Sequence, residues 1–433
     1  MPLLAALFML ALSDAKFEVF TSTREVLAIA RDPRHRWLKV VTSGGVLTRY
    51  GDGWHNDLSP REPGKAEPID LEWNGDKVHI GPFSIQIGDK NIELPASTGS
   101  HISAAAVHDG KLLVAVFDAG LFAYDRAWKP IESPEKDVTA LASIGGELWL
   151  GTHRHGAFHR KDDRWVSLMP QSEIPNHNIQ SLAWLDGTLY ACTLEDGLIT
   201  YAASKWKTVD GLSSNAPRQV LPFLGRLYIR HGTGAIDVLA AKIARGFETN
   251  LPRKQATALA TNGKSLFVGQ WGGWSEYDGN RWRHHFDLPE LKGVQVTCLA
   301  ATKDAVWVGT QGSGLLRIGR SSAGVKAFDE RSGLKDDWIT CLAVDGTTVL
   351  AGTFAGSLAR IEEGSVTTGG PLGIRALAPP YFASMSSLWR VEGNRFQPTK
   401  LPFEPREIQA ICITSDSIWI GCRTALYRLE KLP

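Results

Sequence analysis

The sequence has neither a large excess of one sign of charge nor a block of like charges. Its 433 residues include 47 lysines and arginines against 46 aspartates and glutamates, which leaves a net charge of +1. Nucleic-acid binding requires a clustered basic surface, so this balance argues against a nucleic-acid partner. Long apolar runs are missing as well, because the run from Leu3 to Leu12 has ten residues and is too short to cross a bilayer. We therefore expect neither a nucleic-acid partner nor a stable membrane span.

Cysteine is scarce, and the number of cysteines is odd. The five cysteines include no pair of Cys-x-x-Cys motifs and no histidine-rich partner, so the spacing does not indicate a zinc site. The favoured interpretation is small, buried, free thiols that pack as hydrophobic groups. A disulfide between Cys298 and Cys341, which hold the same place in two repeats, is the alternative in an oxidising compartment.

Familiar catalytic motifs are also absent. The sequence has no Ser-x-Asp-x-Gly-x-Thr-Trp box of sialidases and no tryptophan docking motif of quinoproteins. It has no Gly-x-Ser-x-Gly nucleophile elbow and no phosphate-binding glycine loop with lysine. Carboxylates contributed by separate repeats would converge only in space, so a lyase or hydrolase remains an alternative.

The N-terminal segment has features of an export signal. Ser13-Asp14-Ala15 follows the apolar run and offers small residues at the −3 and −1 positions of a cleavage site. No lysine or arginine precedes the run, which departs from the standard pattern, and a buried N-terminal strand is the alternative. We predict a signal peptide over residues 1–15 and a periplasmic or extracellular chain over 16–433. An intact N-terminus would favour a cytosolic scaffold.

What the sequence does contain is a repeated phrase. Each copy is an apolar strand, a polar turn and a second apolar strand that ends in glycine. The clearest copies occupy residues 138–151, 296–309, 339–352 and 408–421. Self-similarity at a spacing of about 40 residues is typical of a β-propeller, so we predict an all-β fold built from propeller blades.

Alignment on the small residue that opens the third strand gives about eleven units. These residues are Gly45, Pro82, Gly120, Gly156, Gly197, Gly234, Gly273, Gly314, Gly356, Ser386 and Thr424. The copy at 256–287 shows four short strands separated by turn residues, which predicts four-stranded blades. Eleven blades exceed the usual four to eight per ring. The alternatives are one large ring or two rings, for instance of five and six blades with the chain leaving the first and returning, and we favour two.

The two ends of the array complement each other. The last unit, which begins at Ile408, supplies three strands, whereas residues 16–20 look like a fourth strand without its first three. Pairing them would close a ring and remove exposed sheet edges. We therefore predict that residues 16–20 complete the C-terminal blade.

Eight of the 15 tryptophans recur at two places in the repeat. Trp149, Trp307 and Trp419 share a place in the second strand, and the entry to the fourth strand holds Trp54, Trp128, Trp165, Trp206 and Trp282. We expect these eight to pack between neighbouring sheets and not to form an aromatic cage for a ligand.

Three segments carry a family resemblance. Residues 210–215 and 331–337 read as Gly-Leu turns with following polar residues, and residues 307–315 contain Trp-Val-Gly-Thr and then Gly-Leu. The repeat thereby resembles the two-component regulator propeller repeat over most of residues 102–432. The resemblance implies an extracytoplasmic domain that recognises carbohydrate or similar cues, with no general catalytic residues. Since no kinase, DNA-binding or transmembrane segment follows, it implies a free-standing exported propeller.

Binding residues are expected in the loops that join second to third strands and in the loops between blades. Both sets emerge on one face of a propeller, where the scaffold leaves side chains free to vary. The candidates on this loop face are His153, His155, Glu195, His231, Trp271, Trp274, Gln311, Phe354, Arg218, Arg375, Arg406 and Arg423. We predict no catalytic residue, no resident metal and no cofactor from this set.

The histidines of the set permit one specific alternative. His153 and His155, with His159 nearby, could hold a metal together with a carboxylate of a neighbouring blade such as Glu195, although an exposed polar loop is favoured. A cluster of His153, His155, Glu195 and His231 at one channel mouth would instead indicate an enzyme, because catalytic groups must reach one reacting centre.

The aromatic and basic candidates permit two further alternatives. Trp271 and Trp274 flank two glycines and could stack on a sugar or anchor a protein, with packing against the next blade as the favoured alternative. Arg218, Arg375 and Arg406 stand at roughly equivalent places and could grip an anion or pair with carboxylates between blades.

These observations lead to one expected function and one alternative. We expect an exported, non-catalytic propeller that binds a protein or carbohydrate ligand on its loop face. The alternative is a propeller lyase or hydrolase that acts on a polymeric or cyclic substrate.

Overall fold

The structure is a computed structural model that describes residues 16–32, 35, 37–50, 53–57, 68–95, 100–167, 174–320 and 324–430. Within these ranges the chain forms eleven four-stranded antiparallel sheets and three short 3-10 helices. The predicted all-β propeller of about eleven blades is confirmed. The predicted signal peptide over residues 1–15 lies outside the described ranges.

Each sheet is a series of tight hairpins whose turns explain the local fold. In several sheets the turn between the first and second strands places both central residues at positive φ, as in Asp109-Gly110 (48° and 70°) and Asp186-Gly187 (47° and 75°). Type I′ turns of this kind match the twist of the strands that they join. The second strand that follows is an apolar run and is buried along its whole length in several sheets.

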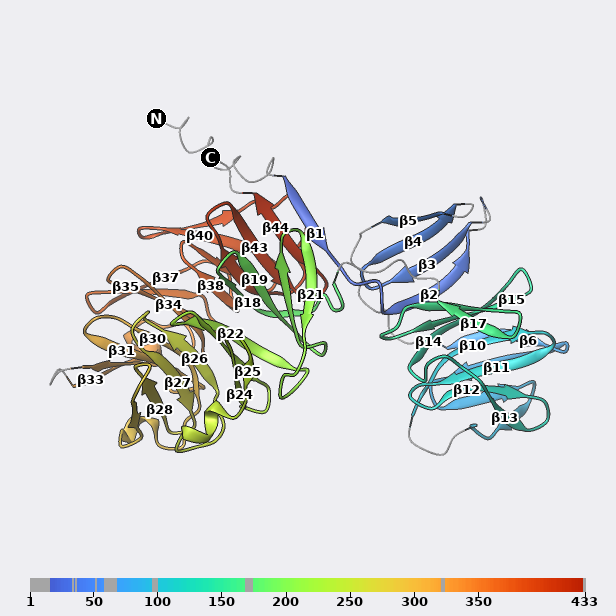
Figure 1. Cartoon of the computed structure of the whole chain (residues 1–433), viewed down its shortest axis with the longest axis horizontal. Coiled ribbons are helices and arrows are strands. Elements are labelled where there is room, and N and C mark those ends of the chain that lie inside the picture. Colours follow the sequence, from blue (N-terminus) through green and yellow to red (C-terminus); the bar gives the residue numbers. More distant parts are fainter. Residues whose placement is uncertain are drawn as a thin grey trace. The chain divides into compact units, whose positions relative to one another are not determined.

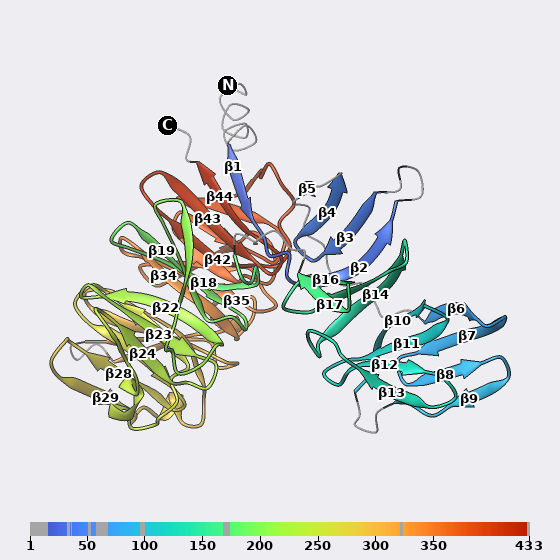
Figure 2. The same cartoon turned by 45° about the vertical axis from the view of Figure 1, so that its right-hand side comes forward.

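The chain divides into two compact units. One consists of Thr21–Pro175 and the other of Met1–Phe20 with Asn176–Pro433, so the chain leaves the second unit after its first strand and later returns to it. We call them the four-sheet unit and the seven-sheet unit (Figures 1 and 2). The division into five and six blades that served as our example is therefore wrong.

The seven-sheet unit holds the following strands, sheet by sheet: β1 (Phe17–Phe20) with β42 (Ile408–Ile413), β43 (Ser417–Cys422) and β44 (Leu426–Glu430); β18 (Ile179–Leu185), β19 (Thr188–Thr193), β20 (Leu198–Ala202) and β21 (Lys205–Val209); β22 (Pro217–Phe223), β23 (Arg226–His231), β24 (Ile236–Leu239) and β25 (Ile243–Ala244); β26 (Ala258–Thr261), β27 (Leu266–Gln270), β28 (Gly273–Tyr277) and β29 (Trp282–His285); β30 (Val296–Ala301), β31 (Ala305–Thr310), β32 (Leu315–Gly319) and β33 (Val325–Phe328); β34 (Ile339–Asp345), β35 (Thr348–Thr353), β36 (Leu358–Glu362) and β37 (Ser365–Gly369); β38 (Ala376–Ala378), β39 (Tyr381–Ala383), β40 (Leu388–Glu392) and β41 (Arg395–Thr399). The helices η1 (Phe247–Asn250), η2 (Pro289–Leu291) and η3 (Glu330–Ser332) connect sheets of this unit.

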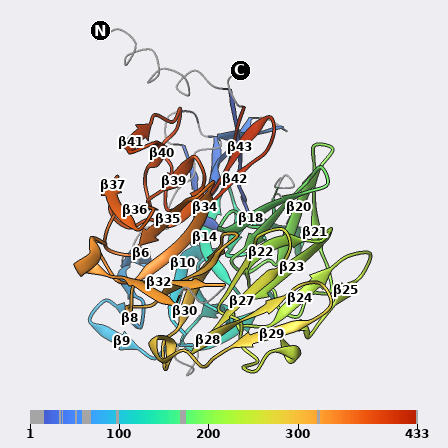
Figure 3. The ribbon, with the colours of Figure 1, turned by 90° about the vertical axis from the view of Figure 1, so that its left-hand side faces the viewer.

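These seven sheets close into a ring through their first strands (Figure 3). β18 packs on β22 at one side and on β42 at the other, so the first sheet of the series meets the last. The glycine that ends the repeated phrase makes this approach possible, since a Cβ on Gly421 would lie 2.6 Å from the side chain of Ile179. Because this ring closes by itself, the alternative of one large ring is wrong.

The N-terminal strand completes the last blade, as predicted. β1 pairs antiparallel with β44 (Figure 1), and the register places Phe20 opposite Leu426. Phe20 ends β1 and stacks on Trp419 at 5.8 Å, in the same way that Phe328 ends β33 and stacks on Trp307 at 5.6 Å. The N-terminal strand thus fills the fourth-strand position of an ordinary blade.

The four-sheet unit repeats the same blade. Its strands are β2 (Val26–Arg31), β3 (Leu38–Thr42), β4 (Gly45–Tyr50) and β5 (Gly53–Asp57); β6 (Ile69–Trp73), β7 (Asp76–Gly81), β8 (Ser84–Ile87) and β9 (Lys90–Ile92); β10 (Ile102–His108), β11 (Lys111–Val116), β12 (Gly120–Tyr124) and β13 (Trp128–Ile131); β14 (Val138–Ile144), β15 (Glu147–Thr152), β16 (Ala157–Lys161) and β17 (Arg164–Ser167). β10 packs on β6 and on β14, and β14 packs on β2. A Cβ on Gly151 would meet Val26, the counterpart of the contact between Gly421 and Ile179.

The recurring tryptophans and the cysteines belong to this scaffold. Trp149, Trp307 and Trp419 are at most 6% exposed, and the half-buried Trp128 donates its indole N–H to the Glu93 carbonyl beyond the preceding sheet (2.7 Å). All five cysteines are free, so the alternative of a disulfide between repeats is not realised. Burial raises the pKa of every cysteine, that of Cys341 to about 11, and keeps the thiols protonated near neutrality.

Candidate functional site

The inner strands of the seven-sheet unit share one irregular position. β30 and β34 each contain a β-bulge whose extra residue is Thr297 or Thr340. The Thr297 hydroxyl donates to the carbonyl of Ile339 in the next sheet (2.5 Å). The Thr340 hydroxyl donates to the carbonyl of Ile374, in the segment that leads into the sheet after that (2.6 Å). A bulge re-aims the side chain that it carries, and here it lets a hydroxyl join two sheets.

This position divides the ring into two halves. It is a threonine on three consecutive sheets, β26–β29, β30–β33 and β34–β37, which we call the threonine half. It is a long polar side chain on the other four sheets, which we call the polar half. In ring order those side chains are Arg375, Gln409, Gln180 and Arg218.

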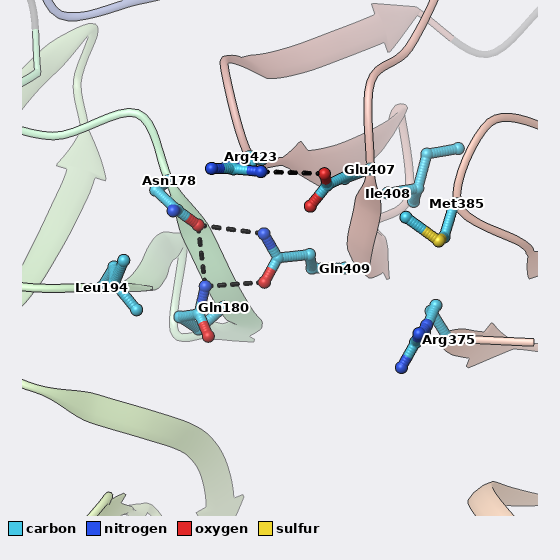
Figure 4. A pocket seen from close by; sticks show the side chains of 9 residues that line it. All are labelled: Asn178, Gln180, Leu194, Arg375, Met385, Glu407, Ile408, Gln409 and Arg423. Carbon is cyan, nitrogen blue, oxygen red and sulfur yellow. Dashed lines mark hydrogen bonds and ion pairs between the residues drawn. The ribbon is translucent and has the colours of Figure 1, made fainter. Parts of the chain in front are cut away.

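The polar side chains bond to one another across the sheet boundaries (Figure 4). Gln180 Nε2 donates to Gln409 Oε1 (2.6 Å) and to Asn178 Oδ1 (2.8 Å), and Gln409 Nε2 donates to the same Asn178 oxygen (2.9 Å). Arg218 Nη1 donates to Gln180 Oε1 (3.5 Å) and to the Leu194 carbonyl (3.3 Å). Three neighbouring sheets therefore contribute to one line of donors and acceptors at the mouth of the ring.

A cavity of about 510 Å³ opens beside this line of side chains. Three sheets of the polar half provide its lining, which consists of Asn178, Gln180, Leu194, Arg375, Met385, Glu407, Ile408, Gln409 and Arg423 (Figure 4). The volume lies within the range of small-molecule sites. Three amides, two guanidinium groups and one carboxylate give the cavity both donors and acceptors, with apolar contacts from Met385, Leu194 and Ile408.

The two arginines of the cavity differ in their partners. Arg423 Nη1 pairs with Glu407 Oε1 at 3.0 Å. Among the described residues Arg375 makes no side-chain hydrogen bond or ion pair, and its guanidinium lies 4.9 Å from the ring centroid of Phe354, which stacks on Trp338. A guanidinium over an aromatic face keeps its forked donors for an outside acceptor.

One of the predicted arginine equivalences needs correction. Arg218 and Arg375 occupy the same position of the repeat, but Arg406 does not. Arg406 is exposed and lies in the loop that leads into β42, where its carbonyl accepts a hydrogen bond from the Arg423 backbone (3.3 Å). Gln409 holds the equivalent position in that sheet.

His231 is not a loop-face residue, because it is fully buried at the end of β23. Its Nε2 lies 2.9 Å from Asp237 Oδ2, and the Asp237 carboxylate also accepts from the Ser213 backbone N–H (2.7 Å) and hydroxyl (2.5 Å). Burial by itself favours the neutral acid, but the hydrogen bonds from His231 and Ser213 outweigh it and lower the pKa of Asp237. Four other repeats have a buried threonine where this one has His231, namely Thr152, Thr193, Thr310 and Thr353.

The two tryptophans proposed as anchors have opposite environments. Trp271 is 44% exposed in the loop between β27 and β28, whereas Trp274 is 2% exposed and stacks on His285 at 4.6 Å. Trp274 is therefore removed from the surface set, since packing holds it inside the unit. Gln311 and Glu195 are exposed in equivalent loops of other sheets and do not line the cavity.

The predicted histidine cluster is divided between the two units. His153 and His155 belong to the four-sheet unit, whereas Glu195 and His231 belong to the seven-sheet unit. The sheet of His153 and His155 packs on β10 and β2 within its unit, so the sheet that follows it in sequence is not its neighbour there. His155 lies instead beside Glu135 and Asp137 of its own unit.

Sequence reasoning missed the three amides, Asn178, Gln180 and Gln409. Their signal was available in the repeat. The residue after the first buried aliphatic of the inner strand is threonine in the copies at 138–151, 296–309 and 339–352, and Gln180 and Gln409 depart from it. Asn178 carries no such signal, because its role depends on the meeting of the first and last sheets of the ring.

Comparison with known proteins identifies the fold. The extracellular domain of BT4673, a proposed one-component system of B. thetaiotaomicron, matches with a TM-score of 0.50 and 14% identity over 94% of this chain. This chain spans 65% of that domain's length. The extracellular domain of BT3049, a proposed hybrid two-component system of the same organism, matches with a TM-score of 0.39 and 14% identity, over 96% of this chain and 83% of that one.

Sequence comparisons add no closer relative. No protein-family model matches the chain, and no curated protein matches it significantly. Among the described residues, none of the helices has the length and apolar character needed to cross a bilayer. The fold shared with the BT4673 domain supports the resemblance to the two-component regulator propeller repeat.

Proposed function

We propose that this chain is an exported, non-catalytic β-propeller that binds a carbohydrate in the cavity of the polar half. The observation that carries the proposal is the line of side-chain amides from Gln409 to Gln180, which borders a cavity of about 510 Å³ together with Arg375 and Arg423. The same position holds threonines in the threonine half, where Thr297 and Thr340 bond to backbone carbonyls.

The lining chemistry suits a polyhydroxylated ligand. Primary amides donate and accept at once, as sugar hydroxyl groups do, and each amide here retains capacity beyond its bonds to its neighbours. Arg375 adds unpaired hydrogen-bond donors at the edge of the cavity. The stacked pair of Phe354 and Trp338 adds an aromatic surface beside the Arg375 guanidinium. Phe354 is 38% exposed and can contact the apolar face of a sugar ring.

Export is part of the same proposal. The apolar run and the small residues at 13–15 support it, as does the resemblance to repeats of extracytoplasmic domains. The BT4673 and BT3049 domains are extracellular parts of proposed signalling systems, which agrees with a ligand-recognition role.

A protein partner is the second candidate, and exposed apolar side chains favour it. Trp271 and Leu372 are 44% and 70% exposed on the seven-sheet unit, and Met385 is 44% exposed at the cavity. Exposed aromatic and methionine side chains are enriched at protein interfaces. Trp271 does not line the cavity, so it separates the two candidates by mutation.

The test is a glycan array probed with residues 16–433, followed by calorimetry on the best glycan. Gln409→Ala and Arg375→Ala should each weaken binding at least tenfold, because each removes donors that face the ligand. Trp271→Ala, a matched control outside the cavity, should leave glycan affinity unchanged.

Three results would overturn the proposal. One is the absence of any glycan that binds the wild-type chain, and a second is full affinity in both cavity variants. Cleavage of the bound glycan during prolonged incubation would replace the non-catalytic assignment with the lyase or hydrolase alternative. Loss of a protein partner in Trp271→Ala alone would favour the second candidate.

A further inference from the structure

A histidine and two carboxylates meet at one edge of the four-sheet unit. Glu135 and Asp137 lie in the segment between β13 and β14, and His155 lies in the loop between β15 and β16. One ligand atom from each residue, the His155 ring nitrogen and one oxygen of each carboxylate, lies within 4.8 Å of the other two. Neither the repeat nor the carbohydrate site accounts for this arrangement.

Asp137 is the unusual member of the group, because it is only 3% exposed. Its Oδ2 pairs with Arg154 Nε at 3.2 Å, whereas its Oδ1 is buried without a hydrogen-bond partner. Burying a carboxylate oxygen without a partner is costly, so the site as it stands is incomplete. The unsatisfied oxygen lies 3.7 Å from His155 Nδ1 and thus faces the other two groups.

The separations fit ligands of a shared cation better than hydrogen-bonded partners. His155 Nδ1 lies 3.5 Å from Glu135 Oε2 and 3.7 Å from Asp137 Oδ1, both longer than an ordinary hydrogen bond of about 2.7–3.2 Å. Nitrogen and oxygen ligands at about 2.0–2.2 Å from a tetrahedral Zn²⁺ lie roughly 3.4 Å from each other. Small side-chain movements would bring all three atoms to that spacing.

The backbone holds the two segments in place. The His153 N–H donates to the Asp137 carbonyl (2.9 Å), which joins the segments directly. The His155 N–H donates to Thr152 Oγ1 (2.9 Å), and Thr152 Oγ1 donates to the Gly156 carbonyl (2.8 Å), so the loop that carries His155 is fixed. Metal sites gain affinity when ligand orientation is set in advance by such outer contacts.

We propose that Glu135, Asp137 and His155 bind one divalent transition-metal ion of the Zn²⁺ type. One imidazole with two carboxylates is a suitable donor set for such an ion, and water completes the coordination because Glu135 and His155 are partly exposed. Arg154 holds the remaining Asp137 oxygen and orients that carboxylate toward the ion. The ion would join the β13–β14 segment to the β15–β16 loop and stabilise the four-sheet unit.

The test uses residues 16–433 freed of metal by a chelator and titrated with Zn²⁺ in a calorimeter. Wild type should bind one ion per chain at this site, and Glu135→Gln and His155→Gln should each weaken it at least tenfold. His79→Gln is the matched control, because His79 pairs with Asp70 at 2.6 Å in the same unit and the described residues place no third metal-binding group beside them. The control should bind as wild type does.

Folding is checked by thermal unfolding without metal, where both variants should match wild type because the altered side chains are partly exposed. Added Zn²⁺ should raise the Tm of wild type and His79→Gln, with little shift in the two site variants. Absence of saturable Zn²⁺ binding would overturn the proposal. So would wild-type affinity in both variants, or an equal loss in His79→Gln.

Discussion

The threonine half and the polar half of the seven-sheet ring use one position of the repeat in opposite ways. In the threonine half, Thr297 and Thr340 turn their hydroxyl groups to the backbone of the next sheet and saturate a carbonyl there. In the polar half, Gln180 contacts the side chains of Gln409 and Arg218, and Gln180 and Gln409 line a cavity.

This difference indicates which position of a repeat protein can acquire a binding site. A short hydroxyl side chain that bonds to a backbone carbonyl has little capacity left, so it serves packing. A glutamine at the same place reaches past the carbonyl and presents a group that can donate and accept. The fold is kept because the scaffold contacts, such as that of Gly421 with Ile179, are the same in both halves.

The largest expected effect tests whether the two halves are equally stable. Phe20 in the polar half and Phe328 in the threonine half hold equivalent places against Trp419 and Trp307. We expect Phe20→Ala and Phe328→Ala each to lower the free energy of unfolding by about 4 kcal/mol, because both empty a buried aromatic site. Denaturant unfolding followed by tryptophan fluorescence measures both. A small effect of Phe20→Ala alone would show that the N-terminal strand does not stabilise the last blade as an ordinary fourth strand does.

The next effect concerns the buried pair of the polar half. Asp237→Asn should cost about 3 kcal/mol near pH 7, because it leaves His231 and Ser213 facing a weaker acceptor inside the unit. Asp304→Asn, in an exposed ion pair with Arg317 in the threonine half, should cost less than about 1 kcal/mol.

The pH dependence of that cost follows from the lowered pKa of Asp237. An acid with a lowered pKa in the folded state stabilises the fold above its unfolded pKa of about 3.9 and loses that contribution as pH falls through the folded pKa. The stability difference between wild type and Asp237→Asn should therefore be full above about pH 5 and shrink below about pH 4. A difference that stays constant down to pH 3 would contradict this assignment.

The smallest expected effects come from changing the residue type at the position that the two halves share. Thr297→Val should cost about 1 kcal/mol, since the Ile339 carbonyl loses the hydrogen bond from the Thr297 hydroxyl. Gln409→Thr should gain up to about 1 kcal/mol, because its hydroxyl can reach the Ile179 carbonyl in the same way, while glycan affinity falls. Urea unfolding and calorimetry report the two quantities. Unchanged affinity in Gln409→Thr would show that the halves do not differ in function.

Much of the fold was predictable because a repeat exposes its own scaffold. The repeated phrase predicted the blades, and the unmatched strand at 16–20 predicted the pairing with β44 that completes the last blade. The candidate site was predictable only in part. Arg375 and Arg423 were found from their loops, whereas Gln180 and Gln409 lie one residue inside the inner strand, where a β-bulge turns them to the cavity. A bulge depends on pairing with the second strand and leaves little trace in single-sequence patterns.

The sequence by itself determined the blade, its four strands, the number of blades and the pairing of the two ends, because these depend on local alternation, turn residues and a fixed repeat. Only the tertiary structure decided that seven sheets close into one ring and four form another unit, since closure depends on which first strands meet. It also decided that His231 is buried and that Asn178 and Gln409 share a cavity. Residues more than 200 positions apart come together only when the last sheet packs on the first.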